Sequence, residues 1–157
     1  MDELSLIYLV LILVILVILS AYFSSSETAM MSLNRYRLKH LADRKYRGAK
    51  RVHQLLERPD RLLGLILLGN NFVNILAAMI VSLITLKIYG PDGLLFSSIA
   101  LTAIILVFAE LMPKTVAAIR PERVAFPSSI ILKALMLMFY PLVWILNKIS
   151  NGLLGIF

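Results

Sequence analysis

Three long stretches of the chain are almost continuously apolar, and polar residues interrupt them at only a few positions. The stretches cover residues 4–33, 62–89 and 94–118. Each is long enough to cross the hydrocarbon core of a bilayer, which needs about 20 residues in a helix. The pattern predicts an all-α integral membrane protein with three transmembrane helices, forming a single transmembrane domain over residues 1–157.

Basic residues are concentrated between the first two apolar stretches. Ten of the sixteen Lys and Arg lie from Arg35 to Arg61. The juxtamembrane segment 35–58 also places Leu38, Val52 and Leu55 at helical spacings, which favours helices lying on an anionic membrane face over a solvated linker. By the positive-inside rule this segment is cytoplasmic and the N-terminus lies outside the cytoplasm.

Residues 127–157 form a fourth apolar region, which is interrupted by Lys133, Pro141 and Asn147. It is either a fourth span or a pair of interfacial helices near the cytoplasmic face. Pro141 near its middle and a lysine at each end of its most apolar part favour interfacial helices.

Composition narrows the function further. With 60% hydrophobic and 16% charged residues and no cysteine, the chain is not an ordinary soluble domain and has no thiolate metal site. The net charge of +7 does not indicate nucleic-acid binding, since aromatic residues do not alternate with the basic ones. The spans contain no histidine and no HExxH motif, so we expect no enzyme activity.

The polar residues within the spans include Ser24, Asn70 and Glu110, one from each span. Each lies nine to eleven residues from the basic residue that marks the cytoplasmic end of its span. In helices this distance places all three at the same depth, roughly 14–16 Å from that end. An acidic residue at the centre of a span costs about 2.5–3.5 kcal/mol on insertion scales, so Glu110 needs a partner, a proton or a cation.

We call this set of polar residues at one depth, Ser24, Asn70 and Glu110, the polar level. Two interpretations of it are open. Pro113 leaves the carbonyl of Ala109 without its helical donor, which adds a backbone oxygen to the hydroxyl, amide and carboxylate oxygens. Such hard ligands suit Mg²⁺ or Na⁺ better than zinc, copper or iron. Alternatively, the polar residues only join the helices by hydrogen bonds, at about 0.6 kcal/mol per contact.

Three motifs resemble the transmembrane domain of the CorC/CorB and CNNM (cyclin M) family of magnesium transporters. Residues 22–29 are Tyr-Phe-Ser-Ser-Ser-Glu-Thr-Ala, residues 68–74 are Leu-Gly-Asn-Asn-Phe-Val-Asn, and residues 109–114 are Ala-Glu-Leu-Met-Pro-Lys. The resemblance covers essentially the whole chain, and the three motifs together are far more specific than any one of them.

The resemblance implies a homodimer in the bilayer with a Mg²⁺ ion between the helices of each protomer. It points to Ser24, Asn70 and Glu110 as metal ligands. Further candidates are Ser26, Asn71, Asn74 and the Ala109 carbonyl, and Glu27 is a candidate for a Na⁺ or proton site. The family usually has Gly at the positions of Ser25 and Ala109, so the close helix approach that Gly allows is not assured.

We therefore expect the membrane domain of a Mg²⁺ transporter in the inner cell membrane, with a cytoplasmic C-terminus. Its expected activity is Mg²⁺ efflux coupled to Na⁺ entry, with Pro113 as a hinge. The family also implies cytosolic CBS and CorC-type domains, which we expect to be absent from this chain. The alternative is a membrane anchor or dimerisation module whose activity lies in those cytosolic domains.

Overall fold

The regular structure of the chain is entirely helical. The computed structural model describes residues 2–156, and within them no strand occurs. The elements in order are α1 (Asp2–Ser32), α2 (Arg35–Asp43), α3 (Arg47–Leu56), α4 (Pro59–Ile88), η1 (Pro91–Gly93), α5 (Leu94–Ile104), η2 (Ile105–Leu111), α6 (Met112–Ile119), α7 (Pro121–Met138) and α8 (Tyr140–Leu154). The predicted all-α fold is confirmed.

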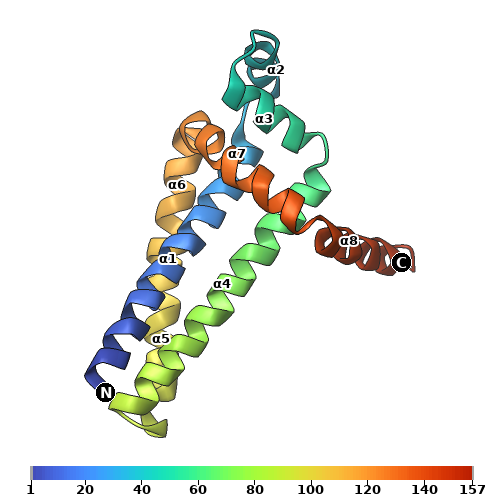
Figure 1. Cartoon of the computed structure of the whole chain (residues 1–157). Coiled ribbons are helices and arrows are strands. Elements are labelled where there is room, and N and C mark those ends of the chain that lie inside the picture. The colour runs from blue at the N-terminus through green and yellow to red at the C-terminus, as the bar shows by residue number, and fades with distance from the viewer. Residues whose placement is uncertain (1, 157) are drawn as a thin grey trace.

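Three helices are long and apolar enough to cross a membrane, as the sequence predicts. They run over Glu3–Ser32, Pro59–Ile88 and Pro91–Ile119, and the last consists of η1, α5, η2 and α6 in succession. Pro59 and Pro91 begin two of them, three residues before the predicted starts at 62 and 94, because proline fits the first turn of a helix. Figure 1 shows the three spans running side by side.

The first span continues as a helix through its serine-rich motif. Serine hydroxyls in an apolar helix need an acceptor, and the carbonyl of Tyr22 provides one for two of them. Ser25 Oγ donates to it at 3.0 Å and Ser26 Oγ at 2.7 Å. The helix therefore reaches Ser32 without exposing an unsatisfied hydroxyl at these two positions.

The basic juxtamembrane segment folds into two short helices that pack on the bundle. Asn34 caps α2 by accepting hydrogen bonds from the backbone N–H groups of Tyr36 and Arg37. Leu38 of α2 and Val52 of α3 are buried. Because its apolar residues are buried, the segment is a packed part of the domain and not a solvated linker.

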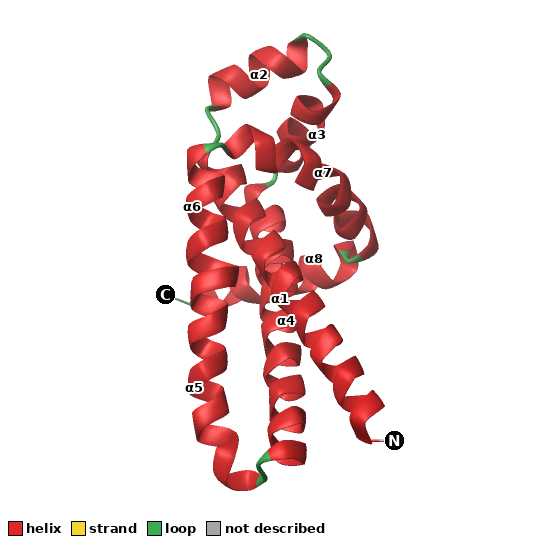
Figure 2. Ribbon diagram, turned by 90° about the vertical axis from the view of Figure 1, so that its left-hand side faces the viewer, coloured by secondary structure: helices red, strands yellow, loops and turns green. Residues whose placement is uncertain are grey.

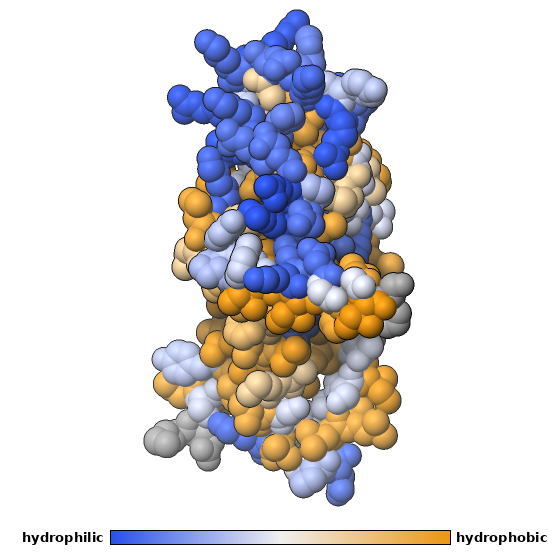
Figure 3. Space-filling view, turned by 90° about the vertical axis from the view of Figure 1, so that its right-hand side faces the viewer, coloured by the Kyte–Doolittle hydropathy of each residue, from blue (hydrophilic) through white to orange (hydrophobic). Residues whose placement is uncertain are grey.

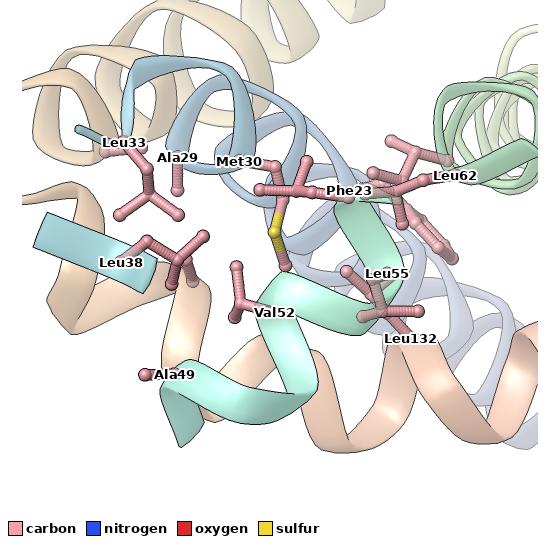
Figure 4. Close-up of a cluster of buried hydrophobic side chains, with 14 of the residues drawn as sticks. Phe23, Ala29, Met30, Leu33, Leu38, Ala49, Val52, Leu55, Leu62 and Leu132 are labelled. Atoms are coloured by element: carbon pink, nitrogen blue, oxygen red, sulfur yellow. The ribbon is translucent and has the colours of Figure 1, made fainter. Parts of the chain in front are cut away.

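The main hydrophobic core lies where this segment meets the spans. Figure 4 shows side chains from α1, α2, α3, α4 and α7 converging there, among them Phe23, Met30, Val52, Leu62 and Leu132. Helix α3 approaches α7 so closely that a Cβ at Gly48 would lie 2.9 Å from the Cβ of Phe126. The core thus holds the three spans together at the end of the bundle where the juxtamembrane helices α2 and α3 pack.

The C-terminal region forms two helices with a sharp bend between them. Helices α7 and α8 meet at 79°. Pro141 lies in the first turn of α8 and Pro127 lies inside α7, so the chain bends at Phe139 and not at a proline in mid-helix. By length and composition the pair could also be one broken span, but Figure 1 shows α7 running obliquely across the bundle and α8 projecting away from it, and in Figure 2 α8 lies behind the spans.

Candidate cation site

Helices α1 and α4 are joined by a serine and two asparagines. Asn70 and Asn74 are one helical turn apart on the same face of α4. Ser20 Oγ lies 3.0 Å from Asn70 Oδ1 and 2.7 Å from Asn74 Oδ1, so its single proton is shared between two amide oxygens. Ser20 is 1% exposed and Asn70 is 9% exposed. Both amide oxygens therefore point between the helices.

Ser20 is a site residue that the sequence analysis missed. It lies four residues before Ser24, on the same face of α1, within a run that is otherwise apolar. This spacing is the signal that could have identified it. Ser20 contacts α4, and Ser24 contacts Glu110 of the third span.

Glu110 meets α1 through Ser24. The fully buried Ser24 Oγ donates to Glu110 Oε1 at 3.5 Å, a long contact compared with the usual 2.7–2.8 Å between a hydroxyl and an oxygen. The Glu110 side chain is 28% exposed. Glu110 is therefore held only loosely by α1 and remains accessible on its other side.

The partner that Glu110 finds is Lys114, one turn later in the same helix. Lys114 Nζ lies 3.3 Å from Glu110 Oε2 and 4.0 Å from Glu27 Oε2. Two carboxylates and one ammonium leave a net charge of −2 + 1 = −1 at this point. The sequence analysis did not anticipate this pairing. A surplus negative charge within the spans favours the binding of a further cation.

The backbone around Glu110 is a π-helical turn, η2, which the sequence analysis also missed. The N–H of Met112 donates to the carbonyl of Val107, five residues earlier. Such a turn widens the helix and is common at functional sites. Ala109 is buried within it, and Pro113 lies in the first turn of α6 directly after it. The hinge at Pro113 and the carbonyl ligand at Ala109 stay predictions.

A pocket between α4 and the third span is lined by polar side chains from both. It has a volume of about 280 Å³ and is lined by Asn74, Ala78, Leu101, Thr102, Ile105, Leu106 and Glu110. Asn74 and Glu110 are its amide and its carboxylate. A cation in this pocket could meet oxygen ligands from α4 and the third span, and Ser24 adds a hydroxyl oxygen from α1, the first span, beside Glu110.

The predicted ligands separate into two groups. Among the first group, Ser24 contacts Glu110, and Asn74 lines the same pocket as Glu110. Asn70 joins Asn74 through the hydroxyl of Ser20, and Glu27 meets Glu110 through Lys114. The structure does not bring Ser26 or Asn71 to this group, because Ser26 Oγ bonds within its own helix and Asn71 is exposed outside the α1 and α4 contact.

The donor set restricts the kind of ion. Among residues 2–156 no three His, Cys, Asp or Glu side chains come close enough to hold a metal together. The available ligands are hydroxyl, amide and carboxylate oxygens, which suit a hard cation that keeps some of its water, such as Mg²⁺. An organic ammonium could also bind, since Lys114 already places one beside Glu110.

Comparison with known proteins identifies the family of the chain. The family described as Cyclin M transmembrane N-terminal domain (CNNM) matches residues 11–157. The UPF0053 inner membrane protein YfjD of Escherichia coli is 52% identical over 136 residues, which are 87% of this chain and 32% of that protein. A UPF0053 protein of Haemophilus influenzae is 48% identical over 156 residues, 99% of this chain and 37% of that protein.

A more distant relative is named for a different substrate. The polyamine export protein of Salmonella typhimurium is 28% identical over 159 residues, which cover 90% of this chain and 35% of that protein. The chain spans about a third of the length of the curated relatives it matches.

Proposed function

The chain belongs to the cyclin M transmembrane-domain family, and we propose that it is the membrane domain of a transporter that exports Mg²⁺ from the cytoplasm. The observation that carries the proposal is the surplus negative charge at Glu110, within reach of neutral oxygens from the other two spans. The chain is a multi-pass membrane protein. Its similarity to an inner membrane protein of Escherichia coli supports the inner membrane as its location.

Mg²⁺ would be held by Glu110, Ser24 and the amide oxygens of Asn70 and Asn74. The carboxylate supplies the charge, and the neutral oxygens replace part of the hydration shell that Mg²⁺ gives up reluctantly. The Ala109 carbonyl beside Glu110 is a further ligand in this proposal. Binding the ion requires Lys114 to withdraw from Glu110, and Glu27 is the carboxylate to which it can move.

The remaining features of the transport cycle belong to the same proposal. Na⁺ entry or a proton would drive the export through Glu27, and the π-helical turn before Pro113 would move between outward and inward states. The N-terminus would lie outside and the C-terminus in the cytoplasm. The transporting unit would be a homodimer that works with cytosolic CBS domains, and its activity is transport and not catalysis.

A second candidate is export of organic polyamines. Lys114 is a primary alkylammonium, and its position between Glu110 and Glu27 supports this candidate, because a polyamine carries the same kind of group. The similarity to the polyamine export protein of Salmonella typhimurium also supports this candidate. A third candidate, an anchor whose polar residues are only interhelical contacts, accounts for Ser20 and Asn70 but gives the surplus charge no role.

Flux measurements in liposomes distinguish these candidates. We expect the reconstituted chain to move Mg²⁺, and Glu110→Gln and Asn70→Ala to abolish this flux. Asn71→Ala is the matched control, because Asn71 is the exposed neighbour of Asn70 and should leave the flux unchanged. Spermidine flux without Mg²⁺ flux would favour the second candidate. Equal Mg²⁺ flux in wild type, Glu110→Gln and Asn70→Ala would rule out the proposed site.

A further inference from the structure

A second pocket lies outside the polar level, where α8 meets the start of α4. Its volume is about 350 Å³, and its lining includes Arg58, Asp60, Arg61, Trp144, Asn147 and Lys148. Val143 and Asn147 of α8 pack against Gly64 of α4, where a Cβ would lie 3.2 Å from Asn147 Oδ1. Helix α8 therefore forms one wall of the pocket, and the start of α4 forms the other.

Helix α8 is amphipathic, and its polar face lines this pocket. Trp144, Asn147, Lys148 and Asn151 follow one face at helical spacing. The opposite face carries Leu142, Ile145, Leu146 and Ile149, all of them exposed in the structure. Such a helix lies at the boundary between lipid headgroups and acyl chains. On the side where α8 projects, Figure 3 shows hydrophilic residues directly above a hydrophobic band.

The pocket carries an excess of positive charge. Arg58, Arg61 and Lys148 against Asp60 give a net charge of 3 − 1 = +2. Within residues 2–156 none of these three cations forms a salt bridge with a carboxylate. They are therefore available to a negatively charged ligand.

Aromatic rings hold two of these cations in position. Arg61 Nη1 donates to the Tyr140 hydroxyl at 2.9 Å, and its guanidinium lies 5.0 Å from the centre of the Tyr140 ring. Lys148 Nζ lies 4.8 Å from the centre of the Trp144 ring. Tyr and Trp are also the residues that membrane proteins favour at the level of the lipid headgroups.

Asn147 adds a donor that has no acceptor. Its Nδ2 is buried and makes no hydrogen bond within the part of the chain that the structure describes. A buried amide without a partner is costly, and such groups in native proteins usually have a ligand or water to satisfy them. A phosphate oxygen is an acceptor that would also be attracted by the surrounding cations.

We propose that the pocket between α8 and the start of α4 binds the phosphate of an anionic phospholipid headgroup. Arg58, Arg61 and Lys148 neutralise the phosphate, and the Asn147 amide, which lines the pocket, turns its buried Nδ2 to donate to it. A lipid and not a free phosphate is the ligand because the exposed apolar face of α8 lies beside the pocket and packs on acyl chains. This inference is independent of the transported ion.

Native mass spectrometry of the purified chain with defined lipids tests the inference. We expect phosphatidylglycerol to remain bound where phosphatidylcholine does not. The Lys148→Gln variant should bind phosphatidylglycerol about fivefold more weakly, the usual effect of one basic residue near an anionic membrane surface. Lys50→Gln is the matched control, since Lys50 is an exposed lysine of α3 outside the pocket and should leave lipid binding unchanged.

The Asn147→Leu variant separates a ligand contact from a packing role. If Asn147 Nδ2 binds the phosphate, the variant should lose phosphatidylglycerol while its thermal unfolding stays at or above that of the wild type. Equal phosphatidylglycerol binding in the wild type, Lys148→Gln and Asn147→Leu would overturn the proposal. Displacement of the lipid by millimolar inorganic phosphate would also overturn it, because the pocket would then be a free phosphate site.

Discussion

Lys114 Nζ lies 3.3 Å from Glu110 Oε2, so the membrane carboxylate of this domain is paired with an ammonium from its own helix. The two residues are one helical turn apart, and Glu110 lies within the π-helical turn whereas Lys114 lies in α6 directly after it. A carboxylate with a tethered ammonium is less costly in a bilayer than a free one. The same ammonium competes with any cation that comes to Glu110.

Removing the Lys114 charge should therefore strengthen cation binding. In Lys114→Gln, Glu110 and Glu27 keep both negative charges and lose their internal competitor. Because both partners are partly exposed, the gain should be modest, about fivefold in the Mg²⁺ dissociation constant, matching an exposed ion pair of about 1 kcal/mol. Isothermal titration calorimetry measures it, with Lys50→Gln as the control. Weaker binding in Lys114→Gln would instead make Lys114 a residue that positions Glu110.

Ser20 should matter for stability as well as for the site. Replacing it by Ala removes the donor that Asn70 Oδ1 and Asn74 Oδ1 share, and should destabilise the domain by about 1 kcal/mol, within the range measured for polar contacts between membrane helices. Thermal unfolding in detergent checks this. Ser82→Ala is the control, because Ser82 Oγ bonds only within its own helix, and an equal loss in both variants would contradict the shared role.

Gly69 should be intolerant of even a methyl group. A Cβ at this position would lie 2.5 Å from the Cζ of Phe23, so Gly69→Ala must push the Phe23 ring out of the core. Overpacking of this kind costs about 1–3 kcal/mol. The melting temperature of Gly69→Ala should fall, whereas that of Gly152→Ala, where α8 has open space around the residue, should stay the same or rise. An unchanged melting temperature in Gly69→Ala would show that α1 and α4 can separate at little cost.

The ion pair between α2 and α7 should contribute little despite its short distance. Arg37 Nε lies 2.6 Å from Glu122 Oε1, but the two side chains are 65% and 33% exposed. Exposed pairs of this kind contribute about 0.2–1 kcal/mol. A double-mutant cycle with Arg37→Ala and Glu122→Ala should give a coupling energy in this range. A coupling energy of several kcal/mol would mean that the pair is shielded from water in the bilayer-bound protein.

Much of the fold followed from the sequence because membrane spans are governed by hydrophobic length. The three spans and the amphipathic character of residues 35–58 depend only on the order of apolar and basic residues. The bend at Phe139 did not follow, because Pro141 could interrupt a helix or begin one, and only the packing of α7 and α8 decides between these positions.

The sequence predicted how deep the site residues lie in the membrane, but not the direction in which each side chain points around its helix. Counting residues from the basic ends placed Ser24, Asn70 and Glu110 at one level, and Ser24 indeed meets Glu110. Counting did not show that Ser26 would bond to its own helix or that Asn71 would be exposed. Nor could it show the π-helical turn, which changes the direction of Glu110 relative to a regular helix.

The central claim is that one hard cation binds among Glu110, Ser24 and the asparagines of α4. Anomalous diffraction from crystals grown with Mn²⁺ in place of Mg²⁺ tests it most directly. We predict one strong peak per chain, about 2.0–2.4 Å from a Glu110 carboxylate oxygen and within reach of an Asn70 or Asn74 oxygen, with Lys114 turned towards Glu27. A map with no peak at Glu110 and with Lys114 still paired to it would contradict the claim.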